Sequence, residues 1–358
     1  MTSLQLDYLP MDQIAARPAS WWHGVLGVVG FTKPPMLAGG DVPVTASMTP
    51  SLRAIEELCE VWRVAGDDEV RLVNGTAGEP AHAGLVRYRF CEDLLFGSLT
   101  LEERAFGGQG GASPQSDRGA AALSQATISA YGAIFEILSR TEHPHLIRVW
   151  NYLPEINGEA DGDERYRHFN CARRVAFRSV GRPTEISVPA ASALGSPPGS
   201  PISIYFLASR EPPKMIENPR QTSAYRYPPK FGVHSPSFSR ACVLSESAGT
   251  NLFVSGTASI VGYETIHHGD VAAQTRETLA NIAALLDEAN RVVGAPRYSL
   301  DELKLKVYVR RPQDLDAIER TLCSRVSPST SIVYLQADVC REDLLVEIEA
   351  TGESPPAR

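Results

Sequence analysis

The stretch NLFVSGTASIVGYE, residues 251–264, is the part of the sequence around which the rest of the fold is expected to be organised. Its apolar residues Leu252 to Val254 predict a strand that stops at Gly256, where the missing Cβ lets a ligand or another backbone come close. The run after Gly269 predicts an amphipathic helix, because its apolar residues recur with a period of 3.6. A strand, a glycine and a helix in this order are typical of a site at a strand end. The alternative is that Ser-Gly-Thr only terminates the strand.

Length and composition indicate an ordinary globular protein. The chain has 358 residues, enough for two domains or one large one, with 43% hydrophobic and 21% charged residues. Its net charge of −8 argues against binding to a nucleic acid or to an anionic membrane, because both require a basic face. No run of 18 apolar residues and no signal-peptide pattern is present, so we expect a cytoplasmic protein with no membrane association.

The cysteines and histidines do not form the pattern of a metal site. Six cysteines are scattered without a CxxC pair, which indicates reduced thiols rather than a disulfide framework. His143, His145 and His168 are not spaced as ligands on one element. We therefore expect no metal.

Periodicity and alternation in the first half of the chain predict a domain of helices and strands. Gly107–Gly119 has the composition of a mobile loop or lid. A loop over Ala190–Ser200 is expected to join two short strands. Helices are predicted over residues 51–62, 120–140 and 166–179, and strands over 145–157, 184–188 and 202–207.

The strand predicted at His145–Asn157 carries an arginine between aromatic residues. Arg148, Trp150 and Tyr152 share one face of this strand because side chains alternate along it. A guanidinium beside two aromatic rings suits a ligand that bears a carboxylate. The alternative is an arginine at a sheet edge that stacks on its neighbours.

A proline-rich segment, Glu211–Gly232, marks the expected domain boundary. The predicted N-terminal α+β domain is residues 1–215, and the predicted C-terminal domain is residues 236–358. Residues 216–235 between them form a linker or an active-site loop. Phenols and cations cluster here at Tyr225, Arg226 and Tyr227, so the segment links the domains, roofs a site for an anion, or does both.

Two strands of the second half present polar faces. Leu303–Arg310 alternates apolar residues with lysine, tyrosine and arginine. In Leu344–Ala350 the residues Glu347 and Glu349 fall on the same face. Carboxylates on a terminal strand are ordinarily solvated. A buried one could instead act as a general acid, because desolvation raises its pKa toward neutrality.

Five segments of the second half resemble the RidA/YjgF family, in the family's order. The resemblance implies a chorismate-mutase-like, ferredoxin-type sheet with helices on one face, usually assembled as a trimer. We keep both a monomer and a homotrimer open. The arginine that the family's enamine deaminases use is absent from Ser329–Ser331, so this activity is not expected. The segments are PSFSRA (236–241), LFVSGTAS (252–259), GDVAAQTRETLANIAALL (269–286), LKVYVRRP (305–312) and LLVEIEA (344–350).

The long N-terminal half and several further segments resemble the chorismatase family. The resemblance implies cleavage of the enolpyruvyl ether of chorismate, a small-molecule substrate, with release of pyruvate and with no metal or organic cofactor. It also implies that Glu347, the first glutamate of EIEA, is the proton donor, with Glu349 as the alternative. The segments are RVWNYLPEIN (148–157), AYRYPPKFG (224–232), VSGTASIVG (254–262) and LQADVCREDLLVEIEA (335–350).

The expected products follow the types known in that family. We expect 3-hydroxybenzoate, with 4-hydroxybenzoate open as a second product. One alternative is hydrolysis to trans-3,4-dihydroxycyclohexa-1,5-diene carboxylate. Another is a non-catalytic RidA-like ligand-binding protein. The thiol of Cys340 resembles the hydroxybenzoate-forming members, whereas Ala258 resembles the hydrolases. Cys340 could equally be an ordinary small buried residue.

The chemistry of chorismate adds candidate binding residues. Its two carboxylates require cations, and tyrosine hydroxyls can donate to them or wall the ring. Small residues beside the ring should decide how closely water approaches it. The substrate-binding candidates are Arg148, Tyr225, Arg226, Tyr227, Arg240 and Arg310, and the product-determining candidates are Gly256, Ala258 and Cys340.

Overall fold

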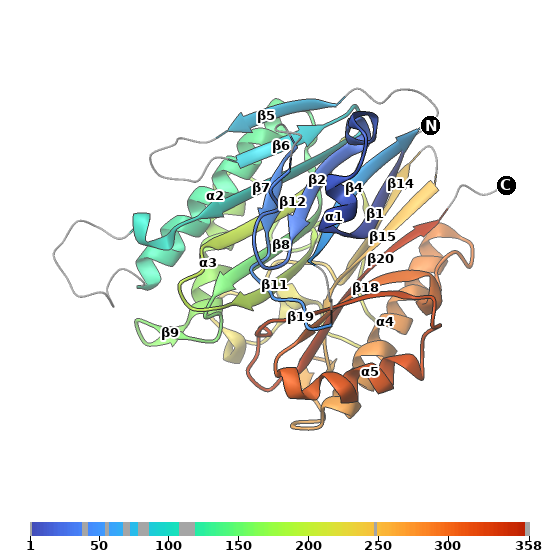
Figure 1. The fold of residues 1–358 in the computed structure, drawn as a ribbon. Coiled ribbons are helices and arrows are strands. Elements are labelled where there is room, and N and C mark those ends of the chain that lie inside the picture. Colours follow the sequence, from blue (N-terminus) through green and yellow to red (C-terminus); the bar gives the residue numbers. More distant parts are fainter. Residues whose placement is uncertain are drawn as a thin grey trace.

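A computed structural model describes residues 2–37, 42–53, 57–66, 72–77, 86–106, 119–246 and 249–354. The loop predicted at Gly107–Gly119 lies almost wholly outside the described residues. Within them, strands and helices alternate irregularly along the chain, and the predicted α+β class is confirmed. Figure 1 shows the helices of residues 120–179 and those of residues 271–323 on opposite sides of the molecule, with the sheets between them.

The first half of the chain builds a six-stranded sheet with two helices on one face. The strands are β5 (Val73–Ala77), β6 (Val86–Phe90), β7 (Leu94–Leu101), β8 (His145–Pro154), β11 (Ala190–Ser196) and β12 (Ile202–Ser209). Their order is β11-β8-β12-β7-β6-β5, with β8 and β11 parallel. The helices are α2 (Ala120–Arg140) and α3 (Arg165–Ser179), both close to prediction. A two-residue hairpin, β9 (Glu159–Ala160) and β10 (Asp163–Glu164), precedes α3.

Helix α2 is the central helix of this half. Among the described residues it is the one helix long and apolar enough to cross a membrane, and 61% of that stretch is buried. Leu123, Ile134 and Leu138 are fully buried against the sheet and α3. The hydrophobicity of α2 is therefore explained by its place in the core.

A second, four-stranded sheet corrects one sequence-based expectation. It has the order β1-β4-β2-β3, and the short helix α1 (Met11–Ala15) follows its first strand. Residues 51–62 do not form the predicted helix, because from Leu58 onward they belong to β4. Buried residues alternate there, with Cys59 and Val61 in one core and Trp62 in another. A strand buried on both faces lacks the polar face that would have identified it. The strands are β1 (Thr2–Pro10), β2 (Val25–Gly30), β3 (Val44–Ala46) and β4 (Leu58–Gly66).

The second half builds another six-stranded sheet, with both of its helices on one face, as predicted. The order is β13-β14-β15-β20-β18-β19. Asp270 caps α4 by accepting a bond from the Ala273 amide at 2.9 Å, and Gly294 ends it in the left-handed region with φ of 73°. The elements are β13 (Lys214–Ile216), β14 (Ala241–Glu246), β15 (Gly249–Thr257), α4 (Val271–Val293), β18 (Leu303–Val309), α5 (Leu315–Cys323), β19 (Ser331–Gln336) and β20 (Val346–Ser354). A small hairpin of β16 (Ile260–Val261) and β17 (Glu264–Thr265) lies between β15 and α4.

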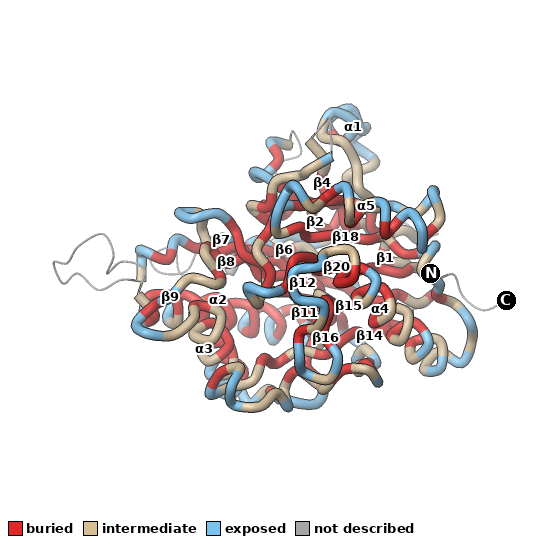
Figure 2. Tube along the Cα trace, turned by 90° about the horizontal axis from the view of Figure 1, so that it is seen from below, coloured by how far each residue is buried: buried red, intermediate tan, exposed pale blue. Residues whose placement is uncertain are grey.

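The two six-stranded sheets face each other across a shared aromatic core. Trp150 and Tyr205 of the N-terminal sheet pack with Phe253 and Tyr308 of the C-terminal sheet, and Trp62 of the four-stranded sheet joins them. Trp150 and Tyr205 stack with ring centroids 4.5 Å apart. Figure 2 shows the buried residues concentrated along the strands and the exposed ones along the outer loops. Because one core spans both halves, the division at residues 215 and 236 stays a prediction.

Strand β11 was missed in the sequence. Residues 184–188 were expected to form a strand and Ala190–Ser200 a loop, but the strand is Ala190–Ser196. Its sequence AASALGS contains small residues of low strand propensity. These residues fit here because β11 pairs with β8 and lies close to β15 of the other sheet. Tertiary packing outweighs local propensity in this segment.

Candidate active site

Strand β20 presents its two faces to different surroundings. Ile348 and Ala350 face the core under α4 and α5, whereas Glu347 and Glu349 face the N-terminal sheet. The two glutamates share one face, as predicted, and their exposed fractions are only 3% and 4%. Since burial of an ionised carboxylate is costly unless it is paired, the partners of each glutamate decide its charge.

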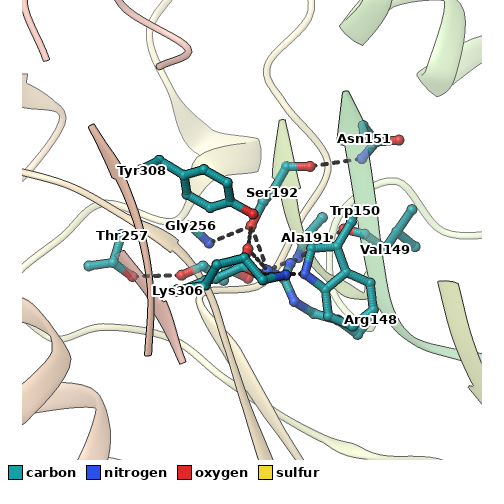
Figure 3. Close-up of polar contacts among 12 residues, drawn as sticks. Arg148, Val149, Trp150, Asn151, Ala191, Ser192, Gly256, Thr257, Lys306 and Tyr308 are labelled. Atoms are coloured by element: carbon teal, nitrogen blue, oxygen red, sulfur yellow. Dashed lines mark hydrogen bonds and ion pairs between the residues drawn. The ribbon is translucent and has the colours of Figure 1, made fainter. Parts of the chain in front are cut away.

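Glu349 is surrounded by donors. Its Oε2 lies 2.7 Å from Arg148 Nη2 and accepts a bond of 2.7 Å from Ser192 Oγ. Its Oε1 lies 2.8 Å from Lys306 Nζ and accepts from Trp150 Nε1 at 2.7 Å. Figure 3 shows these donor side chains converging from β8, β11 and β18. Burial alone would raise the pKa of Glu349, but Lys306 and Arg148 outweigh it and hold the pKa below its usual value, so this residue is a carboxylate.

Glu347 has the opposite environment. Among the described residues no hydrogen bond or ion pair reaches its carboxyl group. Burial, and then the charge of Glu349, raises its pKa to about 8 against the opposing effects of Arg148, Arg240 and Arg310. The group therefore carries its proton at neutral pH, which is the state that a general acid requires.

Gly256 provides the space that Glu347 occupies. The pairing of β15 with β20 shifts between Val254 and Thr257, so Gly256 lies in a bulge. A Cβ at position 256 would lie 1.9 Å from Glu347 Oε1. The amide of Gly256 donates to Ser192 Oγ at 3.0 Å. Any residue larger than glycine would displace the acid.

Cys340 and Tyr166 lie near Glu347. Burial raises the pKa of Cys340 to about 12, with Glu347 as the next cause, so the thiol stays protonated. Burial also raises the pKa of Tyr166 on α3, and Cys340, Glu347 and Tyr227 act on it as well. Ala258 packs in a small apolar cluster with Val339 and Leu344, against which Cys340 lies. The structure thus packs Cys340, on which Glu347 acts, against the cluster that contains Ala258.

Two guanidinium groups flank Tyr227. The carbon centre of Arg240 lies 5.6 Å from the centroid of this ring, and that of Arg341 lies 5.3 Å from it. Arg240 Nη2 donates to Tyr227 Oη at 2.7 Å and to Thr222 O at 2.8 Å. Within the described chain, Arg240 Nε and Arg341 Nη2 are buried without a partner. An unpaired buried donor is costly, so these two N–H groups suit an anionic ligand.

Arg341, Tyr166 and Ser192 were not singled out from the sequence. Arg341 directly follows Cys340, so its position in the chain was the available signal. Tyr166 begins a predicted helix, and Ser192 lies on the strand that was expected to be a loop. Nothing in the sequence alone places Tyr166 or Ser192 near Glu347.

The remaining candidates are differently placed. Arg148 is committed to Glu349. Arg310 donates to the carbonyl groups of Val339, Arg341 and Leu344, and it pairs with Asp338 at 2.7 Å. It thereby holds the loop that carries Cys340. Arg226 is exposed, with its guanidinium 5.8 Å from the ring of the half-buried Tyr225. Binding of substrate by any of these residues stays a prediction.

A cavity of about 600 Å³ opens where β8, β11, β18 and β19 end. Arg310 lines it. Glu155, Asp338 and Glu342 line it as well, so carboxylates outnumber guanidinium groups and the cavity suits an anionic ligand poorly. Across the described ranges no group of three or more histidine, cysteine or acidic side chains could hold a metal ion.

Comparisons with known proteins agree on one family. Residues 69–208 match the family model described as Chorismatase FkbO/Hyg5-like, N-terminal. A chorismatase of Streptomyces rapamycinicus is 35% identical over 353 residues, which cover 96% of each chain. A 3-hydroxybenzoate synthase of Streptomyces hygroscopicus is 41% identical over 63% of this chain and 68% of its own length. A crystal structure of a chorismatase matches 98% of each chain with a TM-score of 0.78 and 31% identity.

Proposed function

This chain belongs to the chorismatase family, and on that premise we propose that it cleaves the enolpyruvyl ether of chorismate to pyruvate and a hydroxybenzoate. The observation that carries the proposal is the state of Glu347, a buried carboxyl group that keeps its proton at neutral pH. Cleavage of an enol ether begins with proton transfer to its methylene carbon, and this step requires such an acid.

Glu347 is assigned as the proton donor. Its proton moves to the terminal methylene carbon of the enolpyruvyl group, and the ether carbon becomes an oxocarbenium ion. The Glu347 carboxylate that remains stabilises this cation electrostatically. Breakage of the bond between the ring carbon and the ether oxygen then releases pyruvate. Because the ether oxygen leaves with pyruvate, loss of the proton from the hydroxyl-bearing ring carbon gives 4-hydroxybenzoate. For 3-hydroxybenzoate, the neighbouring ring hydroxyl displaces pyruvate, loses its proton and forms an epoxide. Opening of the epoxide leaves its oxygen on the former ether carbon, which loses its proton as the ring becomes aromatic. Neither route consumes water.

Arg240 and Arg341 are assigned to the two carboxylates of chorismate. Both groups flank Tyr227, and each has a buried N–H without a partner in the described residues. A charge-assisted bond contributes about 1.5–3 kcal/mol where it is shielded from water. The Tyr227 ring lies close to both guanidinium groups and can wall the ring of the substrate. Arg148 and Arg310 are less suited, because protein groups already occupy their donors.

The product is proposed to be 3-hydroxybenzoate, with 4-hydroxybenzoate as a second product. The support is the position of Cys340, whose protonated thiol lies beside Glu347 next to apolar residues. Hydrolysis to the dihydrodiol, which would consume one water molecule, stays the alternative that the resemblance of Ala258 to the hydrolases favours. The cytoplasmic location and the choice between monomer and homotrimer stay predictions.

The test is incubation of the purified protein with chorismate. Pyruvate is measured with lactate dehydrogenase, and the ring product is identified by chromatography. We expect pyruvate and 3-hydroxybenzoate from the wild type and a loss of roughly a thousandfold in E347Q. Absence of pyruvate from the wild type would contradict the proposal. The dihydrodiol as sole product would contradict only the assignment of the product.

A further inference from the structure

Four charged side chains from four strands meet in the core between the sheets. Glu60 of β4 and Glu349 of β20 flank Lys306 of β18, with Lys306 Nζ 2.5 Å from Glu60 Oε2 and 2.8 Å from Glu349 Oε1. Arg148 of β8 pairs with the far oxygen of Glu349. All four residues are at most 4% exposed. We name Glu60, Arg148, Lys306 and Glu349 the buried charge cluster; its charges sum to zero.

Stability is a weak reason for such a cluster. Desolvation of buried ions can exceed their mutual attraction, and apolar residues of similar volume are often as stabilising or more so. Here the cluster lies among Trp62, Trp150 and Tyr205, where apolar residues would pack readily. A cluster that packing does not require is better explained by what its charges do to a neighbour.

Ser192 links the buried charge cluster to Gly256, the residue that leaves space for Glu347. Its hydroxyl donates to Glu349 Oε2 at 2.7 Å and accepts from the Gly256 amide at 3.0 Å and from Arg148 Nη2. A serine hydroxyl has one donor and two acceptor positions, so Ser192 is fully used. The bulge that holds Gly256 lies opposite Glu349, and Glu347 occupies the space beside Gly256. The Ser192 hydroxyl therefore holds both the Glu349 carboxylate and the Gly256 backbone against which Glu347 lies.

We propose that Glu349 is a positioning residue whose fixed negative charge keeps the proton on Glu347 until the substrate takes it. The inference rests on the proposed function of Glu347 as the acid. Arg148 and Lys306 keep Glu349 ionised, and Ser192 with Trp150 keeps it in place. Transfer of the proton to substrate would leave two carboxylates on one face of β20, so Glu347 is also ready to take back a proton from the ring.

The other groups that face Glu347 are neutral, or they are cations that favour its ionised form. Burial raises the pKa of both Cys340 and Tyr166, so they carry no charge at neutral pH. The cations favour the carboxylate form. Among the described groups that act on Glu347, Glu349 is the anion. The titratable groups are Glu349 on β20, Arg148 on β8, Arg310 after β18, Arg240 before β14, Cys340 before β20 and Tyr166 on α3.

The test compares two variants that remove one negative charge from the same cluster. The rate of pyruvate release is measured as a function of pH for E349Q and for its matched control E60Q. In E349Q the alkaline limb of kcat/KM should move to lower pH by about one unit or more, because a carboxylate beside Glu347 is gone. In E60Q it should stay within about 0.3 units of the wild type, since Lys306 lies between Glu60 and Glu349. If Glu349 had a purely structural role, the alkaline limb would move equally in E349Q and in E60Q.

Folding is checked by thermal unfolding, because each single variant leaves a buried positive charge in excess. Should either fail to fold, the pair E349Q/K306M and E60Q/K306M replaces it, since both double variants keep the cluster neutral. The same contrast is expected between them. Equal shifts in the two members of a pair, or no shift without Glu349, would overturn the inference. Retention of full activity in E347Q would instead contradict the proposed function, so the two failures are distinguishable.

Discussion

Glu347 and Glu349 project from the same face of β20 toward the N-terminal sheet, and both are almost fully buried. Glu349 receives donors from three other strands and is ionised. Glu347 receives none from the described residues and lies against the bare backbone of Gly256, so it keeps its proton. Identical side chains two residues apart thus hold opposite protonation states at neutral pH. The difference comes from the partners that other strands supply.

The largest expected effect separates activity from stability. E347Q should lose about a thousandfold in kcat without any loss of stability at neutral pH, because a neutral acid is replaced by a neutral amide that need not take up a proton on folding. E349Q should lose about 3–5 kcal/mol of stability, because it leaves buried cations unpaired. Pyruvate release measures kcat, and urea unfolding measures the free energy of unfolding. A large loss of stability in E347Q would mean that its carboxyl group has a partner.

The next effect concerns Gly256, the residue that leaves space for Glu347. G256A should reduce kcat by roughly a hundredfold, because its Cβ would lie 1.9 Å from Glu347 Oε1 and displace the carboxyl group. A matched control is G132A on α2, where a Cβ meets nothing within 4 Å. The control should keep wild-type activity and gain slightly in stability, since alanine favours the helix. Activity of G256A close to that of the wild type would contradict this role for the glycine.

The raised pKa of Glu347 also predicts how stability depends on pH. Its pKa rises from 4.5 in the unfolded chain to about 8 in the fold, so the folded state binds the proton more tightly. This contribution is fully present below pH 4.5 and is lost as pH rises toward 8. The stability of the wild type relative to E347Q should therefore fall over that window, by on the order of 3 kcal/mol. Urea titrations at several pH values measure the difference, and a difference that rises with pH would reverse the sign of the argument.

The smallest effect concerns the arginines. R240Q and R341Q should each raise KM for chorismate roughly tenfold with a smaller change in kcat, because each loses a charge-assisted bond to a carboxylate. R226Q, which changes an exposed arginine of the same segment, is the control and should stay within about twofold of the wild type. Steady-state kinetics of pyruvate release distinguish them. Equal effects of R240Q and R226Q would remove the proposed carboxylate site around Tyr227.

Local patterns were sufficient for several elements. The period of apolar residues located α2 at Ala120–Arg140, and the same period in the run after Gly269 located α4. Alternation placed Glu347 and Glu349 on one face. These features follow from residues near one another in the chain. Strand β4, taken for a helix, and β11, taken for a loop, were missed because burial on both faces and close packing of small residues leave no periodic signal.

By itself, the sequence determined the α+β class, the family, and the presence of two carboxyl groups on one strand face. It could not decide which of them is an acid, because a pKa depends on burial and on charges a few ångströms away. Those charges come from Arg148 and Lys306, which lie 201 and 43 positions from Glu349 along the chain. It also could not tell which arginines keep an N–H without a protein partner. The packing of the two sheets decides which glutamate is the acid and which arginines keep an unpaired N–H. Strands that are distant in the sequence come together at this interface, and they pair some of these groups and leave others unpaired.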